Sequence, residues 1–255
     1  MDDGQLLDIC LQVTGSFEGG TPRYDAVTGN SDGQGMSVGI LQWNMGQGTL
    51  QKLLGEIGAS MGWIKARAFF PLCNIEALAL MSPRVGIAYA IEHFLHVGNN
   101  RVLSLLSSIA WKLFLNTPES IAAQRAYATS TVLRSAHLLA RRFVPEAANS
   151  TRVIAFFFDV VTQEGSMRTV EPIEGPASSG PALYYAATEN LACTERWRSV
   201  VGTDLLAQKL LYYAYERAKL GNPEYMWDAL ARRGTIATRV GIVHETPIDL
   251  TAVLD

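Results

Sequence analysis

The sequence predicts a mainly helical fold of the α+β class, with a small β-hairpin or sheet near its start. Two observations support this prediction. Apolar residues recur at helical spacing through most of the chain, and one glycine-punctuated stretch near the start carries strand-forming residues. A hydrophobic content of 48% with 18% charged residues, over 255 residues, is typical of a globular chain with a large core.

The first predicted helix ends just before two glycines. Its apolar stripe of helical period consists of Leu6, Ile9, Cys10, Val13 and Phe17. Gly19-Gly20 ends the helix, because glycine readily takes the left-handed conformation that closes helix C-termini. Glu18 therefore falls on the last turn beside Phe17. Apolar surroundings raise carboxyl pKa values, as a general acid working near neutral pH requires. A solvated glutamate at a helix end is the alternative interpretation.

The stretch from Ser31 to Trp43 predicts a β-hairpin. Asp32-Gly33 is a turn dipeptide that opens hairpins, and the glycines permit positive φ angles. An ordinary structural hairpin explains this stretch equally well on local grounds. Glu18 and Asp32 nevertheless supply two carboxyl groups close together in the sequence. Glycosidic bond cleavage commonly uses such a pair, one protonated and the other ionised.

Most of the remaining chain predicts helices. Apolar stripes run through 50–57, 87–95, 102–113, 153–161 and 205–213, and a further helix extends from Pro118 to Tyr127. The 153–161 stripe is apolar on much of its surface, as a central buried helix would be. The Pro/Gly/Ser-rich loop near 175–181 is a candidate hinge between lobes, and a plain surface loop is an equally good interpretation.

Composition and charge disfavour several classes of protein. The net charge of −3 provides no basic footprint for nucleic acid. The three cysteines form no C-x-x-C pair, and His93 and His96 lack a third ligand, so we expect no metal and no other cofactor. Cys10 on the first stripe is interpreted as a buried reduced thiol, which suggests folding in a reducing compartment.

Neither a signal peptide nor a membrane span is expected. The first residues are acidic rather than basic, and no apolar run is long enough to cross a bilayer. We therefore expect synthesis in the cytoplasm without a signal peptide.

The hairpin carries a resemblance to a known family. Asp32-Gly-x-Gly-x-Ser37-x-Gly39 resembles the D-G-x-G-x-[ST]-x-G hairpin of the family 46 chitosanases, which belong to the lysozyme-like superfamily. The resemblance implies Glu18 as the general acid, Asp32 as the general base and Ser37 as a hydroxyl that holds the attacking water. It also implies a single catalytic domain over residues 1–255, with two helical lobes and the hairpin beside an active-site cleft.

Two later segments resemble motifs of bacterial and phage peptidoglycan-degrading members of this superfamily. Residues 158–165 look like their F-D-x-x-x-Q-x-G helix end, and residues 232–236 look like their R-R-x-x-I segment. If the helix that carries Asp159 and Gln163 ends under the cleft, Gln163 can hydrogen-bond a sugar, and Asp159 lies one turn away. A polar helix-end network without a ligand is the alternative.

Four other residues complete the predicted site. Arg232 and Arg233 are expected to pair with cleft carboxylates and to support them, and a solvated basic helix end is the alternative. Tyr24, between the two acids, and Gln42 are candidates for contacts with the substrate.

The sequence thus predicts a muramidase-like glycoside hydrolase that cleaves β-1,4 bonds of peptidoglycan, with Glu18 as acid and Asp32 as base or stabiliser. Compared with the chitosanase pattern, the spacing between these acids is short, and Ser37 replaces the commoner threonine. These differences disfavour chitosan more than they disfavour the fold. The alternatives are a chitosanase, a lytic transglycosylase and a non-catalytic cell-wall-binding module.

The expected partners follow from this prediction. The substrate is a polysaccharide, peptidoglycan rather than chitosan. An antibacterial effector or a phage endolysin would also meet an immunity, inhibitor or delivery protein, and would act on the cell wall or in the periplasm after delivery or release.

Overall fold

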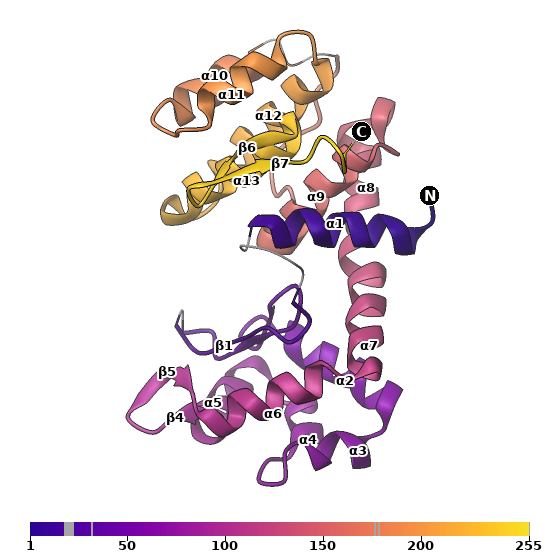
Figure 1. Ribbon diagram of the computed structural model, residues 1–255, viewed down its shortest axis with the longest axis vertical. Coiled ribbons are helices and arrows are strands. Elements are labelled where there is room, and N and C mark those ends of the chain that lie inside the picture. Colours follow the sequence, from indigo (N-terminus) through magenta and orange to yellow (C-terminus); the bar gives the residue numbers. More distant parts are fainter. Residues whose placement is uncertain (18–22, 32, 176, 178, 255) are drawn as a thin grey trace. The chain divides into compact units, whose positions relative to one another are not determined.

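The computed structural model describes residues 1–17, 23–31, 33–175, 177 and 179–254 (Figure 1). It confirms a mainly helical chain with small antiparallel sheets. The chain divides into two compact units, one formed by residues 1–22 with 129–255 and the other by residues 23–128. The loop near 175–181 lies inside the first unit, away from both boundaries. The single catalytic domain and the hinge stay predictions.

The first unit consists of helices and one β-hairpin. Its elements are α1 (Asp3–Phe17), η1 (Thr129–Leu133), α8 (Arg134–Phe143), η2 (Pro145–Ala147), α9 (Thr151–Glu164), α10 (Gly180–Thr188), α11 (Thr194–Val201), α12 (Leu205–Ala218), η3 (Pro223–Tyr225), α13 (Met226–Thr238), β6 (Val240–Val243) and β7 (Thr246–Asp249). β6 and β7 pair antiparallel, with Val243 opposite Thr246, so only two residues form the turn between them.

α9 is the central helix of this unit, as its sequence predicts. Every residue from Thr151 to Val160 is buried, and α1, α8 and α13 all contact this helix. The Ser150 side chain caps its N-terminus by accepting a hydrogen bond from the amide of Val153. Gly165 ends it with a φ of 77°, a conformation that favours glycine. α9 therefore provides a fixed base for the polar residues at its C-terminal end.

α1 buries the apolar stripe that the sequence predicts. Leu6, Cys10, Val13 and Phe17 are buried against the unit, and Ile9 is half-buried. Cys10 is a free cysteine, and burial raises the pKa of its thiol to about 12, so it stays protonated in the core. The two glycines predicted to end this helix lie outside the described residues.

α12 begins at a residue that is both a helix cap and half of an ion pair. The Asp204 carboxylate accepts a hydrogen bond from the amide of Ala207 at 2.9 Å and another from Arg152 of α9 at 2.6 Å. Burial alone would raise the pKa of Asp204. The hydrogen bonds from Arg152 and Ala207, with the charges of Arg152 and Arg239, outweigh burial and lower it.

Asp204→Asn should keep the cap but lose the ion pair, and the loss should depend on pH. A carboxyl group whose pKa is lower in the folded state stabilises the fold above its unfolded pKa of about 3.9. Urea unfolding at pH 7 should show the variant less stable by about 1.5–3 kcal/mol. The difference should shrink as the pH falls below about 4. A difference that stays constant down to low pH would contradict this assignment.

The second unit combines helices with two small sheets. Its elements are β1 (Val27–Thr28), β2 (Ser37–Val38), β3 (Trp43–Asn44), α2 (Thr49–Met61), α3 (Trp63–Ala68), α4 (Ile75–Leu80), α5 (Pro83–His93), β4 (Leu95–His96), β5 (Asn99–Leu103), α6 (Leu105–Leu115) and α7 (Pro118–Ala128). β2 lies between β1 and β3 in one antiparallel sheet, and β4 pairs with β5. The predicted stripe of α2 is fully buried and consists of Leu50, Leu53, Leu54 and Ile57.

α6 buries a different face from the one that its apolar spacing predicts. The predicted stripe is exposed and includes Leu105, Leu106, Ile109 and Leu113. The buried face consists of Ser107, Trp111, Phe114 and Leu115. Trp111 and Phe114 pack against the ring of Phe70, with ring centres 4.8 and 5.3 Å away. The large aromatic side chains decide which face is buried in a helix that is apolar on several sides.

Candidate functional site

The predicted site residues fall into three groups. Glu18 and Asp32 lie outside the described residues. Tyr24, Ser37 and Gln42 belong to the second unit, whereas the first unit contains Asp159, Gln163, Arg232 and Arg233.

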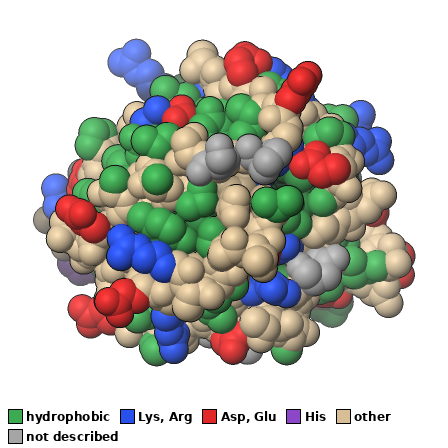
Figure 2. All heavy atoms as spheres, turned by 90° about the horizontal axis from the view of Figure 1, so that it is seen from above, with side chains coloured by type: hydrophobic (Ala, Val, Ile, Leu, Met, Phe, Trp, Pro, Cys, Tyr) green, Lys and Arg blue, Asp and Glu red, His purple; other side chains and the backbone are tan. Residues whose placement is uncertain are grey.

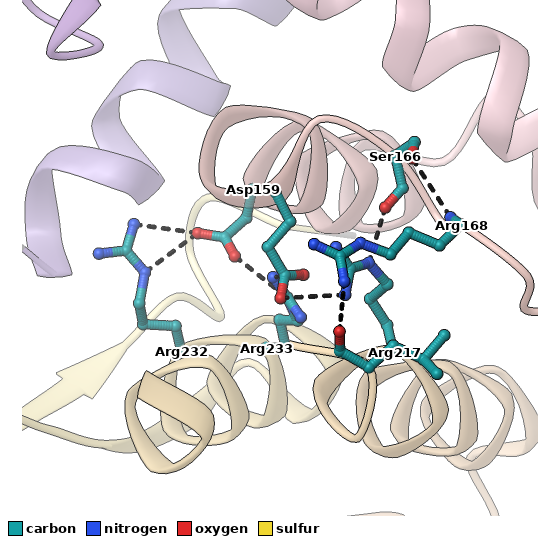
Figure 3. Close-up of polar contacts among 8 residues, drawn as sticks. Asp159, Ser166, Arg168, Arg217, Arg232 and Arg233 are labelled. Atoms are coloured by element: carbon teal, nitrogen blue, oxygen red, sulfur yellow. Dashed lines mark hydrogen bonds and ion pairs between the residues drawn. The ribbon is translucent and has the colours of Figure 1, made fainter. Parts of the chain in front are cut away.

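Asp159, on α9, lies between two arginines of α13 (Figure 3). Its Oδ1 accepts hydrogen bonds from Nε and Nη2 of Arg232 at 3.1 and 3.0 Å, and its Oδ2 accepts one from Nε of Arg233 at 3.4 Å. All three side chains are at most 2% exposed. A buried carboxylate needs such partners, because burial removes the water that would otherwise stabilise its charge.

Glu164 extends this arrangement at the end of α9. Its Oε2 is 2.6 Å from Nη2 of Arg233, and its Oε1 is 3.2 Å from Nη1 of Arg217. Nε of Arg217 also donates to the carbonyl of Ser166 at 2.7 Å (Figure 3). We call Asp159, Glu164, Arg217, Arg232 and Arg233 the arginine cluster. Within it, two carboxylates face three buried guanidinium groups, so the cluster has an excess of positive charge.

Gln163 and Asp159 differ in burial although they lie one turn apart on α9. Asp159 is 1% exposed, whereas Gln163 is at the surface of the unit. Their spacing predicts similar directions, but the C-terminal end of the helix reaches solvent where Gln163 lies. A contact between Gln163 and a sugar stays a prediction, as does the contact predicted for Asp159. Both oxygens of Asp159 already accept hydrogen bonds from the arginines.

α13 also holds the last described residue of α1. The guanidinium of Arg232 lies 4.9 Å from the centre of the Phe17 ring. The carbonyl oxygen of Phe17 is 3.0 Å from Nδ1 of His244, whose Nε2 is 2.6 Å from Oδ1 of Asp228. We call Phe17, Asp228, Arg232 and His244 the helix-end junction. Phe17 directly precedes Glu18 in the sequence, so the junction holds the neighbour of the predicted acid.

The sequence reasoning missed two members of this junction, Asp228 and His244. Asp228 and Arg232 are four residues apart on α13, and this spacing places them on one face of the helix. His244 follows the arginine motif in the sequence, but no local pattern links it to Phe17. The only available signal was the pair of charged residues at helical spacing on α13.

Ser37 lies on β2 and bonds to the neighbouring strand. Its Oγ accepts a hydrogen bond from the side-chain Nδ2 of Asn44 at 2.9 Å. The backbone amide of Asn44 donates to Oγ1 of Thr49 at 2.7 Å. A serine hydroxyl that accepts one bond still has its own proton to donate. This arrangement orients Ser37, and its predicted role in holding water stays a prediction.

Tyr24 and Gln42 are also fixed by hydrogen bonds within the second unit. The hydroxyl of Tyr24 accepts from Nη1 of Arg125 at 3.0 Å. Nε2 of Gln42 donates to the carbonyl of Gly39 at 2.9 Å, and its Oε1 accepts from Thr28 at 3.0 Å. Both side chains therefore have defined positions, and their contacts with a substrate stay predictions.

The described residues contain neither a candidate metal cluster nor a helix that could span a membrane. They include no group of three or more His, Cys, Asp and Glu side chains placed to hold a metal ion. α5 ends at His93 and His96 lies on β4, so the two histidines do not share a helix face. No helix in the described ranges has the length and apolarity to cross a bilayer. On the face of the molecule that Figure 2 shows, acidic and basic side chains are interspersed.

Comparison with known proteins gives a limited result. No family model and no curated protein sequence matches the chain. The fold is similar to a native chitosanase from Bacillus subtilis MY002, with a TM-score of 0.48, and to a mutant of that enzyme complexed with 6 GlcN, with a TM-score of 0.46. Each match is 18% identical and covers 92% of this chain and 87% of the other. The assignment of function therefore rests on the residues of this chain.

Proposed function

We propose that the protein is a lysozyme-like glycoside hydrolase that cleaves the β-1,4 bonds of peptidoglycan. The observation that carries this proposal is the helix-end junction, which holds Phe17 through both its ring and its carbonyl. A general acid must lie within hydrogen-bond reach of the oxygen that it protonates. Phe17 directly precedes Glu18 in the sequence, and the sequence motif from Asp32 to Gly39 supplies a second carboxyl group.

In the proposed reaction Glu18 protonates the glycosidic oxygen while the bond to the anomeric carbon breaks. Asp32 accepts a proton from the attacking water, and the Ser37 hydroxyl orients that water. The water oxygen bonds to the anomeric carbon from the opposite face, so the configuration inverts. Exchange of protons with solvent then restores both carboxyl groups. We place this reaction at the cell wall or in the periplasm, where the substrate lies, after delivery or release.

Chitosan is the second candidate substrate, because the hairpin motif resembles that of the chitosanases. A polymer of glucosammonium groups favours a strongly acidic surface, whereas the net charge here is only −3. This weak acidity favours peptidoglycan.

Digestion of purified sacculi, followed by mass spectrometry of the soluble products, tests the proposal. New reducing ends would support a hydrolase, whereas anhydro ends would identify a lytic transglycosylase. Binding to sacculi without released muropeptides would identify a non-catalytic wall-binding module. A parallel assay on chitosan completes the test, because turnover of chitosan with none of sacculi would overturn peptidoglycan as the substrate.

A further inference from the structure

A hollow of about 450 Å³ opens on the first unit between the start of α1 and the segment formed by η1 and α8. Its polar lining includes Asp3 of α1, Thr129 and Ser130 of η1, and Arg134 and Arg141 of α8. Every residue that lines the hollow belongs to the first unit. Sites that hold small ligands usually measure about 300–1,000 Å³, so the hollow is large enough for such a ligand.

The backbone beside the hollow is unusual. η1 is a π-helical turn that leads directly into α8, and π-helical turns are rare and frequently lie at functional sites. Leu133, the last residue of η1, is fully buried, whereas Leu138 of α8 is 59% exposed, and both contribute to the lining. The hollow thus combines an apolar part with a few polar groups, as small-ligand sites usually do.

α8 gives the hollow a positively charged side. The helix carries three arginines and no acidic residue. Arg134 and Arg141 line the hollow, and their seven-residue spacing places them on one face of α8, about 10 Å apart along its axis. Within the described ranges, neither of these two side chains forms an ion pair or a hydrogen bond. Arg142 does not line the hollow and pairs with Glu171 at 3.3 Å.

One carboxylate in the lining opposes these two cations. Asp3 is 71% exposed, and its Oδ1 lies 3.9 Å from Nε2 of His137. Two guanidinium groups and one carboxylate leave the hollow positively charged without any contribution from the histidine. A ligand with carboxylate groups would supply partners for Arg134 and Arg141, because a guanidinium group binds a carboxylate through paired hydrogen bonds.

We propose that this hollow binds the carboxylate groups of the peptide stems of peptidoglycan and so helps to retain the protein on the cell wall. The inference rests on the proposed function for the choice of polymer, whereas the preference for carboxylates rests on Arg134 and Arg141. The glycan strands of peptidoglycan carry short peptides with free carboxylates. Chitosan carries amino groups that are positively charged when protonated, and the two arginines would repel them.

Binding of a single peptide should be weak. One exposed ion pair changes an affinity by about fivefold at most. Peptides recur throughout the wall, however, and a second contact with the same polymer raises the effective concentration of the first. A weak site of this kind would therefore lengthen the time that the protein stays on its polymer.

Titration calorimetry with a soluble wall peptide that has two free carboxylates tests the hollow on the intact protein without any activity. Arg141→Gln should weaken binding by about three- to fivefold, and the double variant with Arg134→Gln by about tenfold or more. Arg142→Gln is the matched control, because it removes the same charge from the next position of the helix but outside the hollow. This control should bind as the wild type, and the diamide of the peptide should not bind.

Three outcomes of the titration would overturn the proposal. Equal losses in Arg141→Gln and Arg142→Gln would show unspecific attraction by a basic helix. A diamide that binds as tightly as the free acid would show that carboxylates are not recognised. Inorganic phosphate, titrated in parallel, would be assigned to the hollow if it binds and the peptide does not.

Sedimentation with purified sacculi in the cold tests the link between the hollow and the wall. The wild type and Arg142→Gln should sediment with sacculi, and the variant that lacks both Arg134 and Arg141 should stay in solution to a larger extent. Sacculi whose carboxylates have been converted to amides should abolish this difference. Equal retention of all three proteins on untreated sacculi would overturn the role in retention. If the protein releases no products from any wall polymer, the proposed function fails, and the calorimetry still decides what the hollow binds.

Discussion

Glu18→Gln should lower kcat on sacculi by about 10²–10⁴-fold, the contribution that a positioned general acid makes. Glutamine has nearly the same size and shape as glutamate but has no acidic proton to give to the glycosidic oxygen. The release of soluble muropeptides measures the rate, and circular dichroism with thermal unfolding measures the fold. The variant should remain folded, because the substitution removes a proton donor and no large side chain.

One further variant makes this result specific. Glu189→Gln, at an exposed glutamate in the same unit, should keep the wild-type rate. Wild-type activity in Glu18→Gln would show that another group is the acid.

Asp32→Asn separates two mechanisms for the same polymer. A hydrolase that needs a base for water should lose about 10²–10⁴-fold in kcat. A lytic transglycosylase, in which the 6-hydroxyl of the substrate attacks, should depend on Glu18 and tolerate this change. Counting reducing ends and anhydro ends in the same digests shows whether the protein acts as a hydrolase or as a lytic transglycosylase.

Asp159→Asn should destabilise the first unit by about 3–5 kcal/mol, as the loss of one partner from a buried ion pair does. The variant leaves Arg232 and Arg233 fully buried, with Glu164 as the one carboxylate left in the arginine cluster. For a chain of this size we expect the midpoint of thermal unfolding to fall by about 6–20 °C. Denaturant titration and differential scanning calorimetry measure both quantities.

The cause of this loss can be tested by removing a cation as well. Asp159→Asn combined with Arg232→Met should recover part of the stability, because an apolar side chain does not need the missing carboxylate. Glu171→Gln is the control, because Glu171 pairs with Arg142 at an exposed site and should contribute little. A single Asp159→Asn variant as stable as the wild type would show that the arginine cluster does not need this charge.

Local patterns predicted the helices better than they predicted what the helices bury. In α2 and α9 the apolar stripe and the buried face agree, because the opposite face is polar or the whole helix is buried. In α6 apolar residues occur on several faces, so the spacing indicates a helix without indicating its orientation. The burial of Trp111 and Phe114 depends on Phe70, a contact between residues far apart in the sequence.

The candidate site shows the same division between local and long-range information. Arg232 and Arg233 pair with Asp159, and the expectation that they support cleft carboxylates stays a prediction. The contact between His244 and Phe17 joins residues 227 positions apart, and the turn that presents His244 lacks the glycine that usually marks such turns. No property of either segment alone indicates that they meet, since the contact arises only when α1 packs on α9 and α13.

The discontinuity of the first unit has a consequence for biosynthesis. α1 packs on α9, but residues 23–128 and the following helices are translated between them. At about 5–20 residues per second, on the order of 10 s pass before the ribosome delivers the partner of α1. The second unit is complete before this interval ends, whereas the apolar stripe of α1 has nothing to cover it. The nascent chain therefore carries an aggregation-prone helix until α9 emerges, and a chaperone that shields this helix would favour productive folding.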